Sequence, residues 1–117
     1  MYKYYGLVTR IIDGDTLDVS IDVGFDLRAN VRVRLLGVYA PEIHSKLTAD
    51  EGKLAMARLT DMFTGCATAG EIVLQTVKSD AFGRYLATIW HKDDENAPFQ
   101  PDSVNERMIQ FGYKKPD

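Results

Sequence analysis

The chain holds 117 residues, of which 45% are hydrophobic and 26% charged, and its formal net charge is −3. A chain of this length builds one hydrophobic core and excludes two, so we expect a single domain over residues 1–117. The acidic balance argues against broad, tight coating of DNA or RNA, because such coating requires many neutralised phosphates. It leaves room for a local site in which two or three arginines hold one phosphate.

Cys66 is the only cysteine, which excludes an intrachain disulfide. The N-terminal stretch has no apolar run long enough for a signal peptide, and no later stretch is long enough to span a bilayer. We therefore expect a cytoplasmic protein, secreted only if a leader has been removed, with no membrane partner. A monomer is expected.

The first third of the chain has strand patterns. Tyr4–Ile12 is rich in aromatic and β-branched residues, and Asp13-Gly14 predicts a turn after it. In Thr16–Val23, apolar residues alternate with polar ones, which indicates a strand with one buried and one solvated face. Ala29–Val38 alternates in the same way and predicts a third strand, joined to the second by a loop around Gly24.

Helical signals follow in two places. Thr48–Glu51 fits a capping box that opens a helix running to about Phe63. A second capping box at Ser103–Glu106 opens a short helix that ends near Gly112.

Between the two helices, strands are expected at Glu71–Lys78 and Tyr85–Trp90. The order of elements is then three strands, a helix, two strands and a helix. This order suits a small closed barrel, so the sequence predicts an α+β, mainly β, fold: a five-stranded OB-fold barrel with a helix between strands 3 and 4 and a C-terminal helix.

Four short segments contain the residues best suited to chemistry: DGDT at 13–16, RLLGVYAPE at 34–42, DAFGR at 80–84 and VN at 104–105. Taken singly, each has a structural interpretation, namely a hairpin turn, a strand followed by a loop, a tight turn and the start of a helix. A carboxylate at the rim of a barrel also offers a hard oxygen ligand to Ca²⁺ or Mg²⁺. No single segment decides between these interpretations.

Together and in this order, the four segments resemble those of the staphylococcal nuclease (thermonuclease) family. The family pattern is a DGDT turn, then R-L-hydrophobic-G-hydrophobic-D-A/T-P-E, then D-x-[YF]-G-R, then V-N near the last helix. The resemblance runs from about Leu7 to Gly112. It implies an OB-fold nuclease that hydrolyses phosphodiester bonds of DNA and/or RNA, with Ca²⁺ as the metal, or Mg²⁺ or Mn²⁺ in its place.

The resemblance assigns the catalytic roles to three residues. Arg34 and Arg84 would clamp the phosphate, and Glu42 would stand beside the attacking water. These residue types fit the chemistry, because guanidinium groups neutralise the oxygens of a phosphoryl transition state and a carboxylate can accept a proton from water.

The resemblance likewise implies a metal site. Asp15 would bind the metal through its carboxylate and Ala40 through its carbonyl, with Asp13 and Thr16 as supporting neighbours. Tyr39 and Phe82 would lie on the substrate side, where the ring of Phe82 could stack on a base.

Tyr39 is the main departure from the family pattern, which has a metal-binding aspartate at this position. A neutral phenol is a poor ligand for Ca²⁺. Three outcomes stay open: a weakened Ca²⁺ nuclease, a nuclease that uses another divalent ion, or a catalytically impaired module that binds nucleic acid or a partner. The presence of Arg34, Glu42 and Arg84 favours activity.

The two histidines, His44 and His91, are far apart in the sequence and have no cysteine or histidine cluster near them. We interpret both as surface or loop histidines and assign no zinc site. Val104-Asn105 is interpreted as the start of the last helix.

Overall fold

The structure is a computed structural model that describes residues 2–41, 43, 46–64, 71–79, 85–91 and 99–115. The elements in chain order are β1 (Tyr2–Asp13), β2 (Thr16–Gly24), β3 (Leu27–Leu35), α1 (Ala49–Thr64), β4 (Glu71–Ser79), β5 (Tyr85–His91) and α2 (Val104–Gln110). This order is the predicted one.

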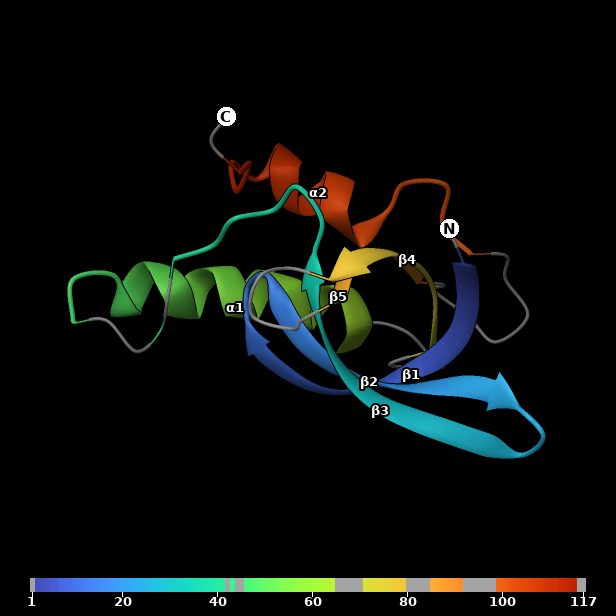
Figure 1. Cartoon of the computed structure of the whole chain (residues 1–117). Coiled ribbons are helices and arrows are strands. Elements are labelled where there is room, and N and C mark those ends of the chain that lie inside the picture. The colour runs from blue at the N-terminus through green and yellow to red at the C-terminus, as the bar shows by residue number, and fades with distance from the viewer. Residues whose placement is uncertain are drawn as a thin grey trace.

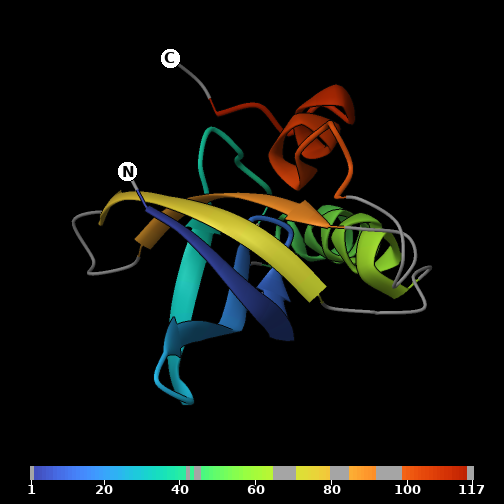
Figure 2. The ribbon, with the colours of Figure 1, turned by 90° about the vertical axis from the view of Figure 1, so that its right-hand side faces the viewer.

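The five strands close into a barrel in the order β1-β2-β3-β5-β4. β3 and β5 are parallel, and the other neighbouring strands are antiparallel. α1 crosses beside one end of the barrel and α2 lies on another side, next to β5 (Figures 1 and 2). The predicted α+β, mainly β, barrel is confirmed. None of the helices in the described part of the chain is both long and apolar enough to cross a lipid bilayer.

The barrel core follows from the alternation of apolar residues along the strands, because successive side chains of a strand point to opposite faces. The buried hydrophobic residues of the strands are Leu17, Val19, Ile21, Val33, Leu35, Ile72, Leu74, Ala87 and Ile89. α1 closes the core with Ala55, Leu59 and Phe63, which are buried at a spacing of four residues and so lie on one helix face.

The third strand was predicted to run from Ala29 to Val38, and both of its bounds are wrong. It begins two residues earlier, at Leu27, because the hairpin loop is a tight two-residue turn. It ends at Leu35, because Gly37 has a φ of 77° and turns the chain out of the sheet. Val38 is still buried, but it pairs with Lys114 in an isolated bridge.

Candidate active site

The turn between β1 and β2 lies against α1 and the segment that follows β3. At Gly14, a Cβ atom would meet the Cβ of Ala55 at 2.7 Å and the Cβ of Ala40 at 2.8 Å. Real Cβ atoms do not approach so closely, so only glycine fits this position without a shift of its neighbours. The close packing fixes the turn, and with it the residue that follows, Asp15.

Asp15 is a buried carboxylate, 7% exposed, whose oxygens are both hydrogen-bonded. Its Oδ1 accepts from the hydroxyl of Thr16 at 2.9 Å, and its Oδ2 accepts from the backbone N–H of Ala40 at 3.1 Å. Its backbone carbonyl accepts from the N–H of Leu35 at 2.8 Å. These bonds orient the side chain, while a carboxylate with about four lone-pair sites can still accept further partners.

Arg34 lies next to Asp15 at the end of β3. Its Nη2 is 3.7 Å from Asp15 Oδ2, and its side chain is 22% exposed. The two residues face each other because Arg34 pairs across the sheet with Thr16, the neighbour of Asp15. The guanidinium thus offsets the charge of a buried carboxylate and remains accessible to a ligand. The structure brings together the predicted Asp15, Thr16 and Arg34.

Tyr39 is half-exposed and is held by its backbone. Its N–H donates to the carbonyl of Tyr113 at 2.9 Å, and the N–H of Lys115 donates to the carbonyl of Gly37 at 3.0 Å. The segment that follows α2 therefore fixes the chain on both sides of Val38. Ala40 contributes its N–H to Asp15, and the predicted role of its carbonyl in metal binding stays a prediction.

The residues of the turn fit a hard divalent cation in the chemistry of their donors. Asp13 Oδ1 is a buried carboxylate oxygen that has no hydrogen-bond partner among the described residues. Asp15 adds a second, preoriented carboxylate two residues later. Oxygen ligands of this kind suit Ca²⁺ or Mg²⁺, and one or two carboxylates plus water suffice for Mg²⁺. Within the ranges that the structure describes, no three histidine, cysteine, aspartate or glutamate residues form a larger metal-binding group.

Three predicted site residues, Glu42, Phe82 and Arg84, lie outside the described residues. Their assigned roles stay predictions, as does the interpretation of His44, which also lies outside.

Asn105 is a positioning residue that the sequence interpretation missed. It is buried at the start of α2, where its Nδ2 donates to the carbonyls of Leu36 and Ala87, both at 2.9 Å. Its Oδ1 accepts from the N–H of Ile89 at 3.1 Å. One side chain thus joins α2, β5 and the residues just after Arg34. A signal was present, since Asn105 and the buried Met108 are three residues apart and so share a helix face.

His91 was interpreted as a surface or loop histidine, and this is wrong. It is the last residue of β5 and is 2% exposed. Its ring packs edge-on against Phe63, and its Nε2 is 3.4 Å from Nη1 of Arg107. The alternation of buried residues in β5, Ala87, Ile89 and His91, places it in the core.

A known protein family and several known proteins are similar to this chain in sequence. The family model described as "Staphylococcal nuclease homologue" matches residues 32–115. Among relatives, the chain is 33% identical over 108 residues to "Protein ParB" of Escherichia coli, covering 92% of this chain and 54% of that protein. It is 30% identical over 108 residues to an "Uncharacterized endonuclease" of Escherichia coli O157:H7, covering 92% of this chain and 58% of that protein.

A third relative is the "Micrococcal nuclease" of Shigella flexneri, 30% identical over 110 residues, which cover 93% of this chain and 56% of that protein. The chain therefore spans about half the length of the curated relatives it matches. The family model covers well over half of the chain. The chain belongs to the staphylococcal nuclease homologue family.

Proposed function

We propose that this chain is a nuclease that hydrolyses phosphodiester bonds of DNA and/or RNA with the help of a divalent cation, Ca²⁺, Mg²⁺ or Mn²⁺. The observation that carries the proposal is the pair of Asp15 and Arg34, a buried, preoriented carboxylate beside an accessible guanidinium. Membership of the nuclease family and the endonuclease names of relatives support it.

In this proposal, Arg34 binds a non-bridging oxygen of the scissile phosphate. Its guanidinium presents parallel N–H donors, and their hydrogen bonds strengthen as negative charge grows in the transition state. Because the neighbouring carboxylate is held by Thr16 and Ala40, the guanidinium has a fixed partner that orients it before substrate arrives.

Asp15 would hold the cation, with Asp13 close to it in the same turn. The bound cation would supply Lewis acidity and favour deprotonation of water. The resemblance gives Glu42 the role of accepting the proton of the attacking water, and Arg84 that of a second phosphate ligand. Both roles are part of the proposal.

A second function, a nucleic-acid-binding or interaction module without catalysis, is favoured by one observation. Tyr39, which replaces the metal-binding aspartate of the family, is half-exposed and contributes no carboxylate. The backbone of this segment is hydrogen-bonded to the residues that follow α2, so a change of side chain at position 39 leaves the backbone of the site in place.

Cleavage of single-stranded and duplex DNA and of RNA with Ca²⁺, Mg²⁺, Mn²⁺ or EDTA tests the two functions. We expect the wild type to cleave with at least one metal and to stop in EDTA, and Arg34→Lys to lose most of the rate because it loses the guanidinium fork. An inactive wild type with an active Tyr39→Asp variant would establish the module instead. If neither cleaves with any metal, the nuclease proposal fails.

A further inference from the structure

One face of β3 has a row of arginines. Arg28, Arg32 and Arg34 are separated by even numbers of residues, so they point to the same side of the strand. Val33 and Leu35, which alternate with them, are buried in the barrel. The arginine row is therefore on the outer surface of the sheet, and it leads away from the candidate active site at Arg34.

Contacts with β2 hold two of these arginines in place. Arg32 donates from Nε to Asp18 Oδ1 at 2.8 Å and from Nη2 to Asp18 Oδ2 at 3.2 Å. Arg28 donates from Nε to Ser20 Oγ at 2.8 Å and from Nη2 to the Ser20 carbonyl at 2.9 Å. A guanidinium carries five N–H donors, so each keeps donors for an external anion.

The charge of this face differs from that of the whole chain. Arg10 on β1 lies opposite Asp18 and so belongs to the same face. The hydrogen bond from Arg32 lowers the pKa of the Asp18 carboxyl, and the charge of Arg10 adds a smaller effect in the same direction. Asp22 lies opposite Arg28. Asp15 offsets Arg34, which leaves three arginines, Arg10, Arg28 and Arg32, against Asp18 and Asp22 along the strands, with Asp26 at the tip. The face is therefore close to neutral on a chain of net charge −3, and its arginines are aligned along one strand, where each can contact a phosphate.

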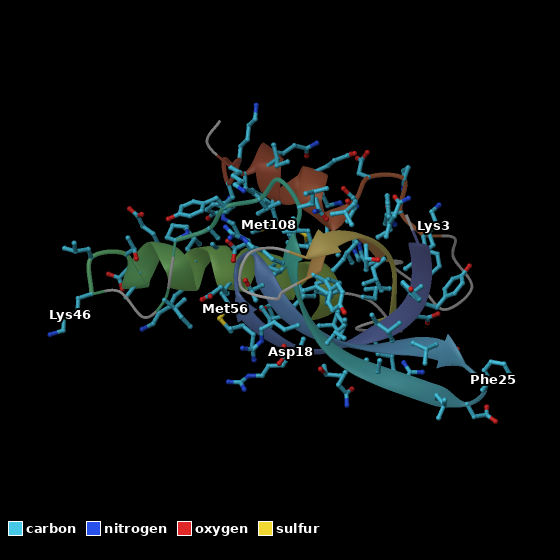
Figure 3. All side chains as sticks on the ribbon, viewed as in Figure 1. Lys3, Asp18, Phe25, Lys46, Met56 and Met108 are labelled. Carbon is cyan, nitrogen blue, oxygen red and sulfur yellow. The ribbon has the colours of Figure 1, made fainter. Side chains whose placement is uncertain are left out.

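The β2–β3 hairpin extends beyond the barrel and ends in an exposed aromatic ring. β1 pairs with β2 only as far as Ile21, so the remainder is a two-stranded ribbon (Figure 1). Phe25 is at its tip, 96% exposed (Figure 3). Phe25 and Asp26 have φ values of 55° and 59°, a conformation that a bulky residue such as phenylalanine rarely adopts. An exposed aromatic residue kept in an unfavourable turn position indicates a functional use of its ring.

We propose that the outer face of the β2–β3 hairpin, from Arg34 to Phe25, binds the continuation of a single-stranded nucleic acid whose scissile phosphate lies at Arg34. Arg32 and Arg28 contact successive phosphates, and Phe25 stacks on an unpaired base. The inference rests on the proposed function and extends it. The ten residues from Phe25 to Arg34 span at most about 30 Å, which suits a site of about four or more nucleotides.

The salt dependence of binding tests the phosphate contacts. Fluorescence anisotropy in EDTA would compare labelled oligothymidylates of about 3 and about 12 nucleotides. Each lost arginine–phosphate contact lowers the slope of log affinity against log salt by about 0.7 for a single strand. We expect this decrease for the long oligonucleotide in Arg28→Gln and about twice the decrease in the Arg28→Gln/Arg32→Gln double variant, with no change for the short one.

Lys46→Gln is the matched control, because it also removes one positive charge and lies at the opposite end of the molecule from Phe25 (Figure 3). It should leave both slopes unchanged. An equal decrease of the salt slope in Lys46→Gln and Arg28→Gln would mean that only the net charge matters and would overturn the proposed binding face. Unchanged slopes in the double variant would overturn it as well.

Phe25→Asn tests the stacking contact without destabilising the protein, since asparagine is well suited to a positive φ. We expect at least about fivefold weaker binding of the long oligonucleotide with equal or higher Tm. Unchanged affinity would remove Phe25 from the site. The two proposals fail separately. If the outer face of the hairpin does not bind nucleic acid, the short oligonucleotide is still cleaved in the presence of metal. If the protein has no nuclease activity, the binding measurements in EDTA still report on the hairpin face.

Discussion

Replacing Asn105 with alanine is expected to destabilise the protein more than any exposed substitution. The side chain makes three hydrogen bonds, of which those to Ala87 and Ile89 are buried and that to Leu36 is partly buried. The Ala87 carbonyl keeps a second donor, the N–H of Leu36 at 2.9 Å. Alanine would therefore leave two backbone groups without a partner, the N–H of Ile89 and the carbonyl of Leu36.

Leaving the buried N–H of Ile89 unpaired costs about 1–3 kcal/mol, and the partly buried carbonyl of Leu36 costs less, so we expect a loss of about 3 kcal/mol in the free energy of unfolding. For 117 residues the entropy of unfolding is about 0.25 kcal/mol per kelvin, which converts the loss into a decrease in Tm of about 12 °C. Because Leu36 is two residues beyond Arg34, cleavage per folded molecule should also decrease.

Urea and thermal unfolding, followed by circular dichroism, measure these quantities. Asn30→Ala is the control, since it makes the same chemical change at an exposed position and should alter stability by no more than about 0.5 kcal/mol. If Asn105→Ala lost less than about 1 kcal/mol, the three hydrogen bonds would not stabilise the junction of α2 and β5 as the geometry indicates.

Three further predictions concern the turn and the sheet surface. Gly14→Ala should lower stability by about 1–3 kcal/mol in urea unfolding, because the new Cβ overlaps two neighbouring alanines, and a normal Tm would contradict this. Thr16→Val removes the hydroxyl that donates to Asp15, so Tm should decrease, whereas Thr16→Ser should retain most of the stability. Arg32→Gln should lower the stability slightly at neutral pH, since Arg32 lowers the pKa of Asp18 through its hydrogen bond and charge. The difference from wild type should vanish as pH falls through that lowered pKa, and a difference that persisted below it would exclude the ion pair as its cause.

The strands and helices could be predicted because burial leaves a regular pattern in the sequence. Period-two alternation located β2, and capping boxes located both helices. The end of β3 was missed because Val38 continues the alternation while being buried by a different contact, its bridge to Lys114. The positive φ of Gly37 is what separates Val38 from the end of β3, and the presence of a glycine in a sequence does not reveal its φ.

The sequence predicted the charged side chains of the site better than the buried polar residues that hold the surrounding elements together. The motif located Asp15 and Arg34, which the structure brings within 3.7 Å. It did not reveal that Asn105 supports this region, because a polar residue at the start of a helix is usually interpreted as part of its cap. His91 was missed for a related reason: a titratable residue was assumed to be solvated, although its position in the alternation of β5 indicated burial.

Backbone hydrogen bonds hold most of the candidate site in place. The geometry of the site is therefore independent of the side chain that determines its metal preference. Asp15 is held through the N–H groups of Ala40 and Leu35, and the chain between them is tied to the segment after α2 through Tyr39 and Tyr113. None of these bonds uses the side chain at position 39. Exchanging tyrosine for aspartate there should therefore add a carboxylate to an intact site. If Tyr39→Asp keeps the wild-type Tm without metal and shows a larger Ca²⁺-induced increase in Tm, the side chain at position 39 determines metal affinity and does not determine stability. A lower Tm without metal would show instead that the tyrosine ring stabilises the folded protein.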